Sequence, residues 1–335
     1  MLLPANGTGP SGASPRPRFR RNLSIRNLEK LFTVITLSVL AQLSLFGQTE
    51  NAIKNVFWQP NELQPGSVIF LTVELNREAT KVSGQFLGKD LLFFHSGKAR
   101  VWYSLAGVDI ETTPGTYDLR IRAALPGGRV SRTVKPVQIG TVTFRAGDVN
   151  VPENFVKPDE ASQRKIAADQ RLKERTFAHF IPTAQWSGDF IKPVEAPLTD
   201  SFGMTRIFNE ELTSEHRGTD FPIKEGSPVV TSNSGTVVLA RDLFYEGNCV
   251  VLDHGQHFFT VYMHLSKIQV REGQKVRKGQ RLGLSGATGR ATGPHLHMGV
   301  RWEGSYVDPT KLFALTLPET NTVVRNGTQS VRRRR

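Results

Sequence analysis

Short runs in which apolar and polar residues alternate fill the chain between about residues 55 and 143. The clearest runs are 67–75, 82–87, 91–95, 99–105, 115–123 and 130–137. A period of two puts every second side chain on a buried sheet face, and turn signals such as Pro126-Gly127-Gly128 separate the runs. We therefore expect a small β-sandwich over residues 55–145.

The pattern changes at residue 160, where EASQRKIAADQRLKERTF (160–177) contains many helix formers and no Gly or Pro. Asp159, which follows Pro158, suits the N-cap position of a helix. The segment predicts one polar helix within a helical linker over residues 155–185. Gly and β-forming residues return from about residue 202, which predicts a second β-rich domain over 186–315. A disordered basic tail is expected over 318–335.

The first 47 residues join a basic, Pro- and Gly-rich segment to an uncharged apolar run at residues 31–46. A run of roughly 16 residues has the length of a signal-peptide core and is short for a bilayer span, which needs about 20. Val39-Leu40-Ala41 and Leu45-Phe46-Gly47 are both candidate cleavage sites, and an uncleaved signal anchor is the alternative. Both alternatives predict an exported protein of the periplasm or cell envelope, and the anchor would attach it to the inner membrane.

Composition and charge narrow the class of protein further. The chain has 335 residues, 38% of them hydrophobic and 22% charged, which fits about two ordinary soluble domains. Its net charge of +13 gathers in residues 16–30 and in Arg332–Arg335. Basic ends attract an anionic membrane surface or wall polymer, and because no nucleic-acid motif accompanies them we expect no nucleic-acid partner. The single cysteine, Cys249, excludes an intramolecular disulfide and lies in an apolar run typical of a buried strand.

Five polar residues of the second β-rich domain form a candidate hydrolytic site: His216, Asp220, His264, His295 and His297. His216 and Asp220 are four residues apart in a loop-like setting and can converge on one ion. His295 and His297 share one face of a strand, because side chains two residues apart point the same way. Two imidazoles and a carboxylate suit Zn²⁺ with an open position for water, and two further histidines can handle protons around that water.

Between about residues 190 and 312 the chain resembles the M23 family of zinc metallopeptidases, the lysostaphin- and LytM-type peptidoglycan endopeptidases. The resemblance rests on the blocks FGMTRIFNEELTSEHRGTDF, VLDHGQHFFTVYMHLS, VREGQKVRKGQRLGLSGATG and GPHLHMGV. It implies a mainly β fold with an antiparallel β-sheet peptidase domain of LytM type. It also implies one Zn²⁺ ion held by His216, Asp220 and His297, with His264 and His295 matching the pair beside the metal-bound water.

Two weaker signals complete the comparison with known families. The segment TPGTYDLRIR (113–122) loosely resembles the late strands of immunoglobulin-like domains of bacterial surface proteins. In DHGQH, His254 and His257 stand where members of the peptidase family often have a glycine-rich DHG-x-G pattern, and the family motif places no ligand there. We assign no functional role to His254, His257, His95 or His179.

The resemblance implies an exported zinc-dependent endopeptidase that hydrolyses peptide cross-links or stem peptides of bacterial peptidoglycan with metal-activated water. We assign His295 as general base and His264 to the oxyanion or the leaving amine, and the two roles can be exchanged. The alternative is a non-catalytic LytM-type regulator that activates a cell-wall amidase. Such regulators typically lose zinc ligands, whereas this chain has all three.

The expected role of the β-sandwich has several alternatives. It could bind peptidoglycan, position the peptidase domain, contact a cell-wall or division partner protein, or serve as a rigid spacer. A further alternative is that the sandwich inhibits the enzyme by covering the cleft. The sequence does not choose between D-alanyl–diaminopimelate bonds and glycyl bridges as the bond that is cut.

Overall fold

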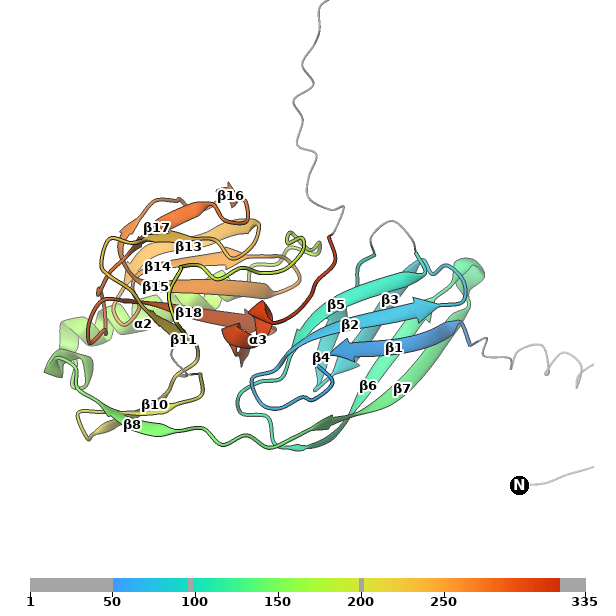
Figure 1. Ribbon diagram of the computed structural model, residues 1–335, viewed down its shortest axis with the longest axis horizontal. Coiled ribbons are helices and arrows are strands. Elements are labelled where there is room, and N and C mark those ends of the chain that lie inside the picture. Colours follow the sequence, from blue (N-terminus) through green and yellow to red (C-terminus); the bar gives the residue numbers. More distant parts are fainter. Residues whose placement is uncertain (1–50, 96–98, 199–201, 320–335) are drawn as a thin grey trace, which may run out of the picture. The chain divides into compact units, whose positions relative to one another are not determined.

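Two groups of β-sheets, joined by a helix-containing segment, make up the described part of the chain (Figure 1). The structure is a computed structural model and describes residues 51–95, 99–198 and 202–319. The expected signal segment within residues 1–47 lies outside the described residues, as does the basic tail from residue 320. Regular structure in the described residues is mainly antiparallel β, as the sequence predicts. None of the helices in these ranges is both long and apolar enough to span a bilayer.

The predicted sandwich region contains two antiparallel sheets, with strand orders β1-β2-β5 and β4-β3-β6-β7. The strands are β1 (Ile53–Gln59), β2 (Val68–Leu75), β3 (Lys81–Phe86), β4 (Lys89–Leu92), β5 (Val101–Gly107), β6 (Gly115–Ala124) and β7 (Val130–Ile139), with a 3-10 turn η1 (Pro126–Gly128) between the last two. Buried residues of both sheets, such as Val73 and Ile121, belong to one hydrophobic core. Five of the six predicted runs coincide with strands, whereas the run 91–95 overlaps β4 only at residues 91 and 92.

The linker between the two groups of sheets contains β8 (Ala146–Val149), a 3-10 turn η2 (Glu153–Phe155) and α2 (Glu160–Phe177). The predicted helix is confirmed, and its N-cap is Asp159, whose carboxylate accepts a hydrogen bond from the backbone N–H of Ser162 at 2.8 Å. The strand β8 was not predicted. It pairs in parallel with β9 (Thr205–Phe208) of the second group, so this part of the linker is built into a sheet with β9 and β10 (Leu212–Glu215).

The second group is dominated by a nine-stranded sheet with the main order β11-β18-β15-β14-β13-β16. Its strands are β11 (Thr219–Pro222), β12 (Pro228–Val230), β13 (Gly235–Leu243), β14 (Gly247–Asp253), β15 (Phe258–Ile268), β16 (Lys275–Val276), β17 (Arg281–Ser285), β18 (His295–Trp302) and β19 (Ser305–Val307), followed by the short helix α3 (Pro309–Phe313). The strand pairs are antiparallel, as expected for the peptidase domain.

Both faces of the central strands are covered, which explains their continuous apolar runs. One face of β14 adds Val250 and Leu252 to the main hydrophobic core. The other face, with Cys249 and Val251, forms a smaller core against which Leu172 and Phe177 of α2 pack. Cys249 is therefore a buried strand cysteine, as predicted, and burial raises the pKa of its thiol well above the usual value.

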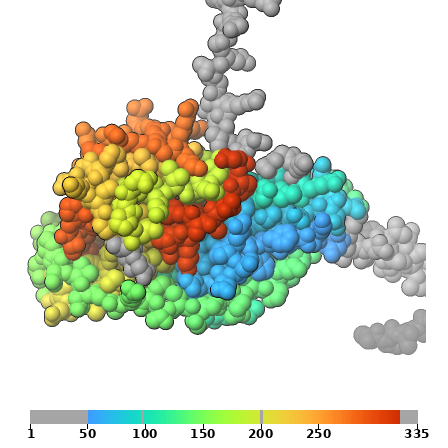
Figure 2. Space-filling view, viewed as in Figure 1, coloured from blue at the N-terminus to red at the C-terminus, as the bar shows by residue number. Residues whose placement is uncertain are grey.

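The residues after α3 pack against the Pro-containing segment that precedes the second group of sheets. In the space-filling view the red C-terminal residues lie against the yellow-green residues of that segment (Figure 2). Gly188 N–H donates to the carbonyl of Pro318 at 3.1 Å, and Ser187 Oγ donates to the Glu319 carboxylate at 2.6 Å. The first two residues of the expected disordered tail are therefore held in place by hydrogen bonds to the domain.

Polar contacts also join the sandwich region to the hairpin of β18 and β19. Lys89 Nζ donates to Ser305 Oγ at 2.6 Å and to the carbonyl of Glu303 at 2.7 Å. The carboxylate of Asp109 accepts a hydrogen bond from the backbone N–H of Tyr306 at 2.9 Å. Burial lowers the pKa of Lys89, which the nearby Asp109 charge opposes. The two groups of sheets therefore share specific hydrogen bonds as well as an apolar boundary.

Candidate metal centre

The pairing of β11 with β18 brings the three candidate metal ligands together. In this antiparallel ladder Asp220 lies directly opposite His297. His216 follows the last residue of β10, and its backbone is held on both sides, by hydrogen bonds with Met204 and Gly203. His297 is thus brought next to Asp220, which lies 77 positions earlier in the chain, and next to His216, which lies 81 positions earlier.

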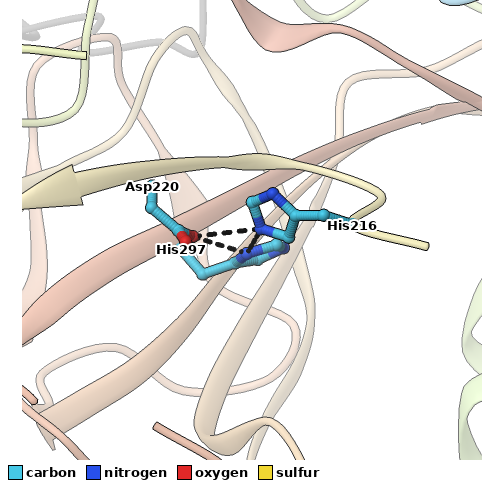
Figure 3. Close-up of side chains that lie close together, drawn as sticks. All are labelled: His216, Asp220 and His297. Carbon is cyan, nitrogen blue, oxygen red and sulfur yellow. Dashed lines mark hydrogen bonds and ion pairs between the residues drawn. The ribbon is translucent and has the colours of Figure 1, made fainter. Parts of the chain in front are cut away.

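The donor atoms of these three side chains form a small triangle (Figure 3). His216 Nε2 lies 2.8 Å from His297 Nδ1 and 3.2 Å from Asp220 Oδ1, and His297 Nδ1 lies 2.9 Å from Asp220 Oδ1. Ligands at about 2.0–2.1 Å from a tetrahedral Zn²⁺ are separated from one another by about 3.3 Å. The triangle is therefore close to one face of a zinc coordination tetrahedron, and the residues fit this ion.

Protonation states also favour a cation. Burial lowers the pKa of His216 to about 4, so its imidazole is neutral near neutral pH. Burial alone would raise the pKa of Asp220, but hydrogen bonds with His216 and His297 outweigh it and hold the carboxyl pKa far below its usual value. Neutral imidazole and ionised carboxylate are the forms that bind a metal, so His216 and Asp220 are both in the form that binds.

Arg206 on β9 orients the carboxylate of Asp220. Its guanidinium donates to Oδ2 at 2.5 Å, while Oδ1 faces the two histidines. A charged partner behind a metal-binding carboxylate fixes its direction and commonly changes metal affinity when removed. Arg206 lies in the FGMTR block of the family resemblance, but its role was not predictable from the sequence, because its partner Asp220 is 14 residues away on another strand.

His264 and His295 lie beside this triangle, as their assignment as assisting histidines requires. Their ring centroids are 4.7 Å apart, and the ring of His264 is 6.0 Å from that of His297. His295 Nε2 lies 3.8 Å from Asp220 Oδ1. All five residues singled out in the sequence therefore meet at one place.

The two assisting histidines are each held through the same ring nitrogen, Nδ1. His264 Nδ1 lies 2.8 Å from the carbonyl oxygen of Thr288, and His295 Nδ1 lies 2.8 Å from that of Gly293. Because a carbonyl only accepts, each Nδ1 must carry the proton, and the Nε2 of a neutral ring is left as an acceptor. Burial and the neighbouring rings of His297 and His295 lower the pKa of His264 to about 3. His264 also has a positive φ of 61°, a conformation that its surroundings must enforce.

Two cavities have residues of the candidate metal centre in their walls. A cavity of about 530 Å³ lies between α2 and the sheet, with Phe177 and Phe259 among its apolar lining residues, and reaches His297. A second cavity, of about 320 Å³, has Asp220 and His295 in its wall together with residues of β8 and β9. Residues of the candidate metal centre therefore line both cavities.

The histidines that received no role have structural partners elsewhere. His254 is fully buried and bonds through its two ring nitrogens to the carbonyl of Ser234 and the hydroxyl of Thr260. His179 Nδ1 lies 2.7 Å from the carboxylate of Asp253, which anchors the segment after α2. His257 stacks on Phe180 and His95 packs on Trp102. None of these four joins the cluster of three that could hold a metal ion among the described residues.

Comparison with known proteins identifies the family. The model of peptidase family M23 matches residues 214–309. A solved structure from Pseudomonas aeruginosa, described as an M23 peptidase, is 30% identical, with a TM-score of 0.58 over 75% of this chain and 95% of that one. This chain belongs to the M23 peptidase family.

Relatives with assigned activities match over shorter stretches. The peptidoglycan DD-endopeptidase ShyA of Vibrio cholerae is 54% identical over 139 residues, which are 41% of this chain and 30% of ShyA. ShyB of the same organism, also named a peptidoglycan DD-endopeptidase, is 46% identical over 96 residues, or 29% of this chain and 22% of ShyB. The chain thus spans less than a third of the length of either curated relative.

Proposed function

We propose that this chain is a zinc-dependent endopeptidase that hydrolyses peptide cross-links or stem peptides of peptidoglycan. The observation that carries the proposal is the triangle of His216, Asp220 and His297, whose donor atoms lie 2.8–3.2 Å apart, with His264 and His295 beside it. The substrate class is supported by the family and by the names of ShyA and ShyB.

Zn²⁺ held by His216, Asp220 and His297 would supply Lewis-acid chemistry, polarising the scissile carbonyl and lowering the pKa of water. The chain itself supplies the proton acceptors. His295 Nε2, left unprotonated by the Nδ1–H bond to Gly293, can take a proton from water as general base. His264 Nε2, whose ring is held in the same way by Thr288, can then pass the proton that the general base has taken from water to the oxyanion or the leaving amine.

Arg206 and the burial of the site residues contribute to positioning and to the exclusion of water. Arg206 keeps the Asp220 carboxylate turned toward the two histidine ligands. The buried surroundings of His216 and His264 exclude bulk water, so that charge–dipole interactions there act in a medium of low dielectric constant. The non-catalytic regulator remains the alternative, but nothing in the described site favours it, because all three ligands and both assisting histidines are present.

The location of the protein belongs to the same proposal. We place it outside the cytoplasm, in the periplasm or cell envelope, cleaved from or anchored by the apolar run at residues 31–46. The cationic ends of the chain would favour an anionic membrane or wall surface. Export agrees with a peptidoglycan substrate, which lies outside the inner membrane.

The decisive experiment measures metal and product together. The full-length protein is analysed for zinc by mass spectrometry and incubated with purified peptidoglycan, and the released fragments are read by mass spectrometry. One zinc per chain and new peptide ends would support the proposal and name the bond. A His216→Ala variant should lose both zinc and cleavage, because two ligands hold the ion far less tightly than three. Absence of zinc and of cleavage in the unmodified protein would overturn the proposal in favour of the regulator.

A further inference from the structure

Arg290 occupies an unusual position in the cavity of about 320 Å³ beside the candidate metal centre. It lies in the loop between β17 and β18, and it shares the cavity wall with Asp220 and His295. Its guanidinium carbon is 4.1 Å from the ring centroid of Phe208 and 4.6 Å from that of Tyr245. Two aromatic rings therefore hold a cation at the edge of the site.

No acidic side chain in the described residues pairs with this guanidinium. Its backbone N–H donates to the carbonyl of Tyr245, but its side chain makes neither an ion pair nor a hydrogen bond there. Glu246, whose charge it senses, is instead paired with Lys173 at 2.6 Å. Burial lowers the pKa of Arg290, which reflects the cost of keeping this charge away from water. A half-buried cation that lacks an anion is arranged to receive one.

The other two charged side chains in the cavity wall, Arg206 and Asp220, form an ion pair with each other. Arg206 donates to Asp220, so the pair cancels its own charge. Arg290 remains as the unpaired positive group in the cavity wall, while Val149, Val151 and Met204 give part of the wall an apolar surface. A planar guanidinium binds a carboxylate through two parallel hydrogen bonds, and an apolar wall accepts a small aliphatic side chain. The ligand that fits is therefore a peptide residue with a small side chain and a free carboxylate.

We propose that this cavity is a carboxylate subsite, in which Arg290 binds a free carboxylate of the substrate peptide close to the bond that is cut. The proposal rests on the proposed peptidase function. It gives the enzyme a preference for peptides that carry a negative charge at this position over otherwise identical neutral peptides. The carboxylate can belong to the chain terminus or to a side chain, and substrates can separate the two.

The kinetic test compares matched substrates. Peptides with the same scissile bond are prepared with both carboxylates free, with only the terminal one amidated, and with only the side-chain one amidated. Arg290→Gln should lower kcat/KM for the preferred carboxylate substrate by roughly 10–100-fold, mainly through KM, because one charged double hydrogen bond is lost. It should change the corresponding amide substrate by less than about 3-fold and leave the zinc content unchanged.

Two further variants separate charge from geometry. Arg290→Lys keeps the charge but loses the planar fork, so it should restore only part of the preference. Arg281→Gln removes an exposed arginine of β17 from the same domain and should leave the preference intact. Equal losses of both substrates in Arg290→Gln would mean that Arg290 only shapes the loop, and an unchanged preference would mean that it binds no carboxylate. Either result overturns the proposal.

A binding measurement keeps this test independent of catalysis. Calorimetry with N-acetyl-D-alanyl-D-alanine and its C-terminal amide is run on zinc-loaded and on metal-free protein. A preference for the free acid that survives metal removal and disappears in Arg290→Gln supports the subsite, even if no peptide is cleaved. A preference that disappears with the metal assigns the carboxylate to the ion instead and overturns the proposal. Failure of the proposed function would appear separately, as absent zinc and absent cleavage in the unmodified protein.

Discussion

The two assisting histidines illustrate how much of the chemistry depends on single hydrogen bonds. His264 and His295 are each fixed through Nδ1 by a backbone carbonyl, so the acceptor nitrogen of each ring is Nε2. A sequence motif names the histidine but leaves the tautomer open, because Thr288 and Gly293 matter here only through their backbone oxygens.

Replacement of His295 tests its assignment as general base. His295→Ala should retain about one zinc per chain, since the three proposed ligands are untouched, and should lose turnover by roughly 10²–10⁴-fold. Zinc analysis and cleavage of a defined muropeptide measure the two properties separately. His257→Ala, which removes a histidine that stacks on Phe180 away from the cluster, is the control and should keep its activity. Full activity in His295→Ala would refute the assignment.

Gly218 is a second residue on which the metal centre depends. It lies between His216 and Asp220, and a Cβ at this position would lie too close to His297 Nε2 and to the carbonyl oxygen of Met298. Gly218→Ala should therefore displace the imidazole of His297 and weaken zinc binding by roughly 10–100-fold, the range seen when support for a ligand is lost. Competition with a chromogenic chelator measures the affinity.

The matched control for this substitution lies on the same strand as His297. A Cβ at Gly299 would meet the carbonyl oxygen of Arg217 at 3.5 Å and Val261 Cβ at 3.6 Å, which are ordinary contacts. Gly299→Ala should keep the zinc affinity of the unmodified protein. If both variants bind zinc equally well, close packing at Gly218 does not hold His297 in place.

At the scale of elements, β8 shows that the linker is not purely helical but contributes a strand to a sheet. The strand pairs with β9, which carries Arg206, and the adjoining Val151 exchanges two hydrogen bonds of 2.9 Å with the side chain of Asn209. Val149 and Val151 also line the proposed carboxylate subsite. The segment after the sandwich is therefore part of the wall of the site, whereas the sequence suggested only a connector.

Removal of the Asn209 side chain should detach β8 locally. Asn209 has a φ of 49°, so Asn209→Gly keeps the backbone conformation while losing both side-chain hydrogen bonds. The local free energy of opening should fall by about 1–2 kcal/mol, which speeds amide hydrogen exchange over residues 146–151 by roughly 5–30-fold. Exchange in β14, measured in the same experiment, should not change. Uniform acceleration across both regions would instead indicate global destabilisation.

At the scale of the whole molecule, buried histidines link folding to pH. Burial lowers the pKa of His254 from 6.5 to about 4, and the ring is held neutral between Ser234 and Thr260. In the unfolded chain the pKa returns to about 6.5, so the unfolded state binds more protons between about pH 4 and pH 6.5. The contribution to stability is complete above this window and falls as the pH falls through it.

Thermal and urea unfolding at several pH values measure this effect. Between about pH 7.5 and pH 5, His254 should remove about 2 kcal/mol from the free energy of unfolding. His254→Gln should have a lower stability at neutral pH but should lose about 2 kcal/mol less on acidification than the unmodified protein. Both proteins are compared without metal, so that zinc release does not contribute. Identical pH slopes would show that His254 is not the group responsible.

Features that depend on neighbours along the chain could be predicted from the sequence. Most strands of the sandwich coincide with the predicted β-like runs, although β1 was not among them, and α2 follows from its composition and its Asp159 cap. The five site residues stood out because each lies within a short motif, and the blocks around them carried the family resemblance. These signals are local, so they can be read before any folding is known.

Features that depend on contacts between distant segments are visible only in the folded chain. Register between β11 and β18 placed Asp220 opposite His297, and the pairing of β8 with β9 built the linker into the domain. Arg206 gained its role from Asp220, and Arg290 from the rings of Phe208 and Tyr245. Such partners are set by sheet register and by the burial of side chains, which short sequence patterns do not encode.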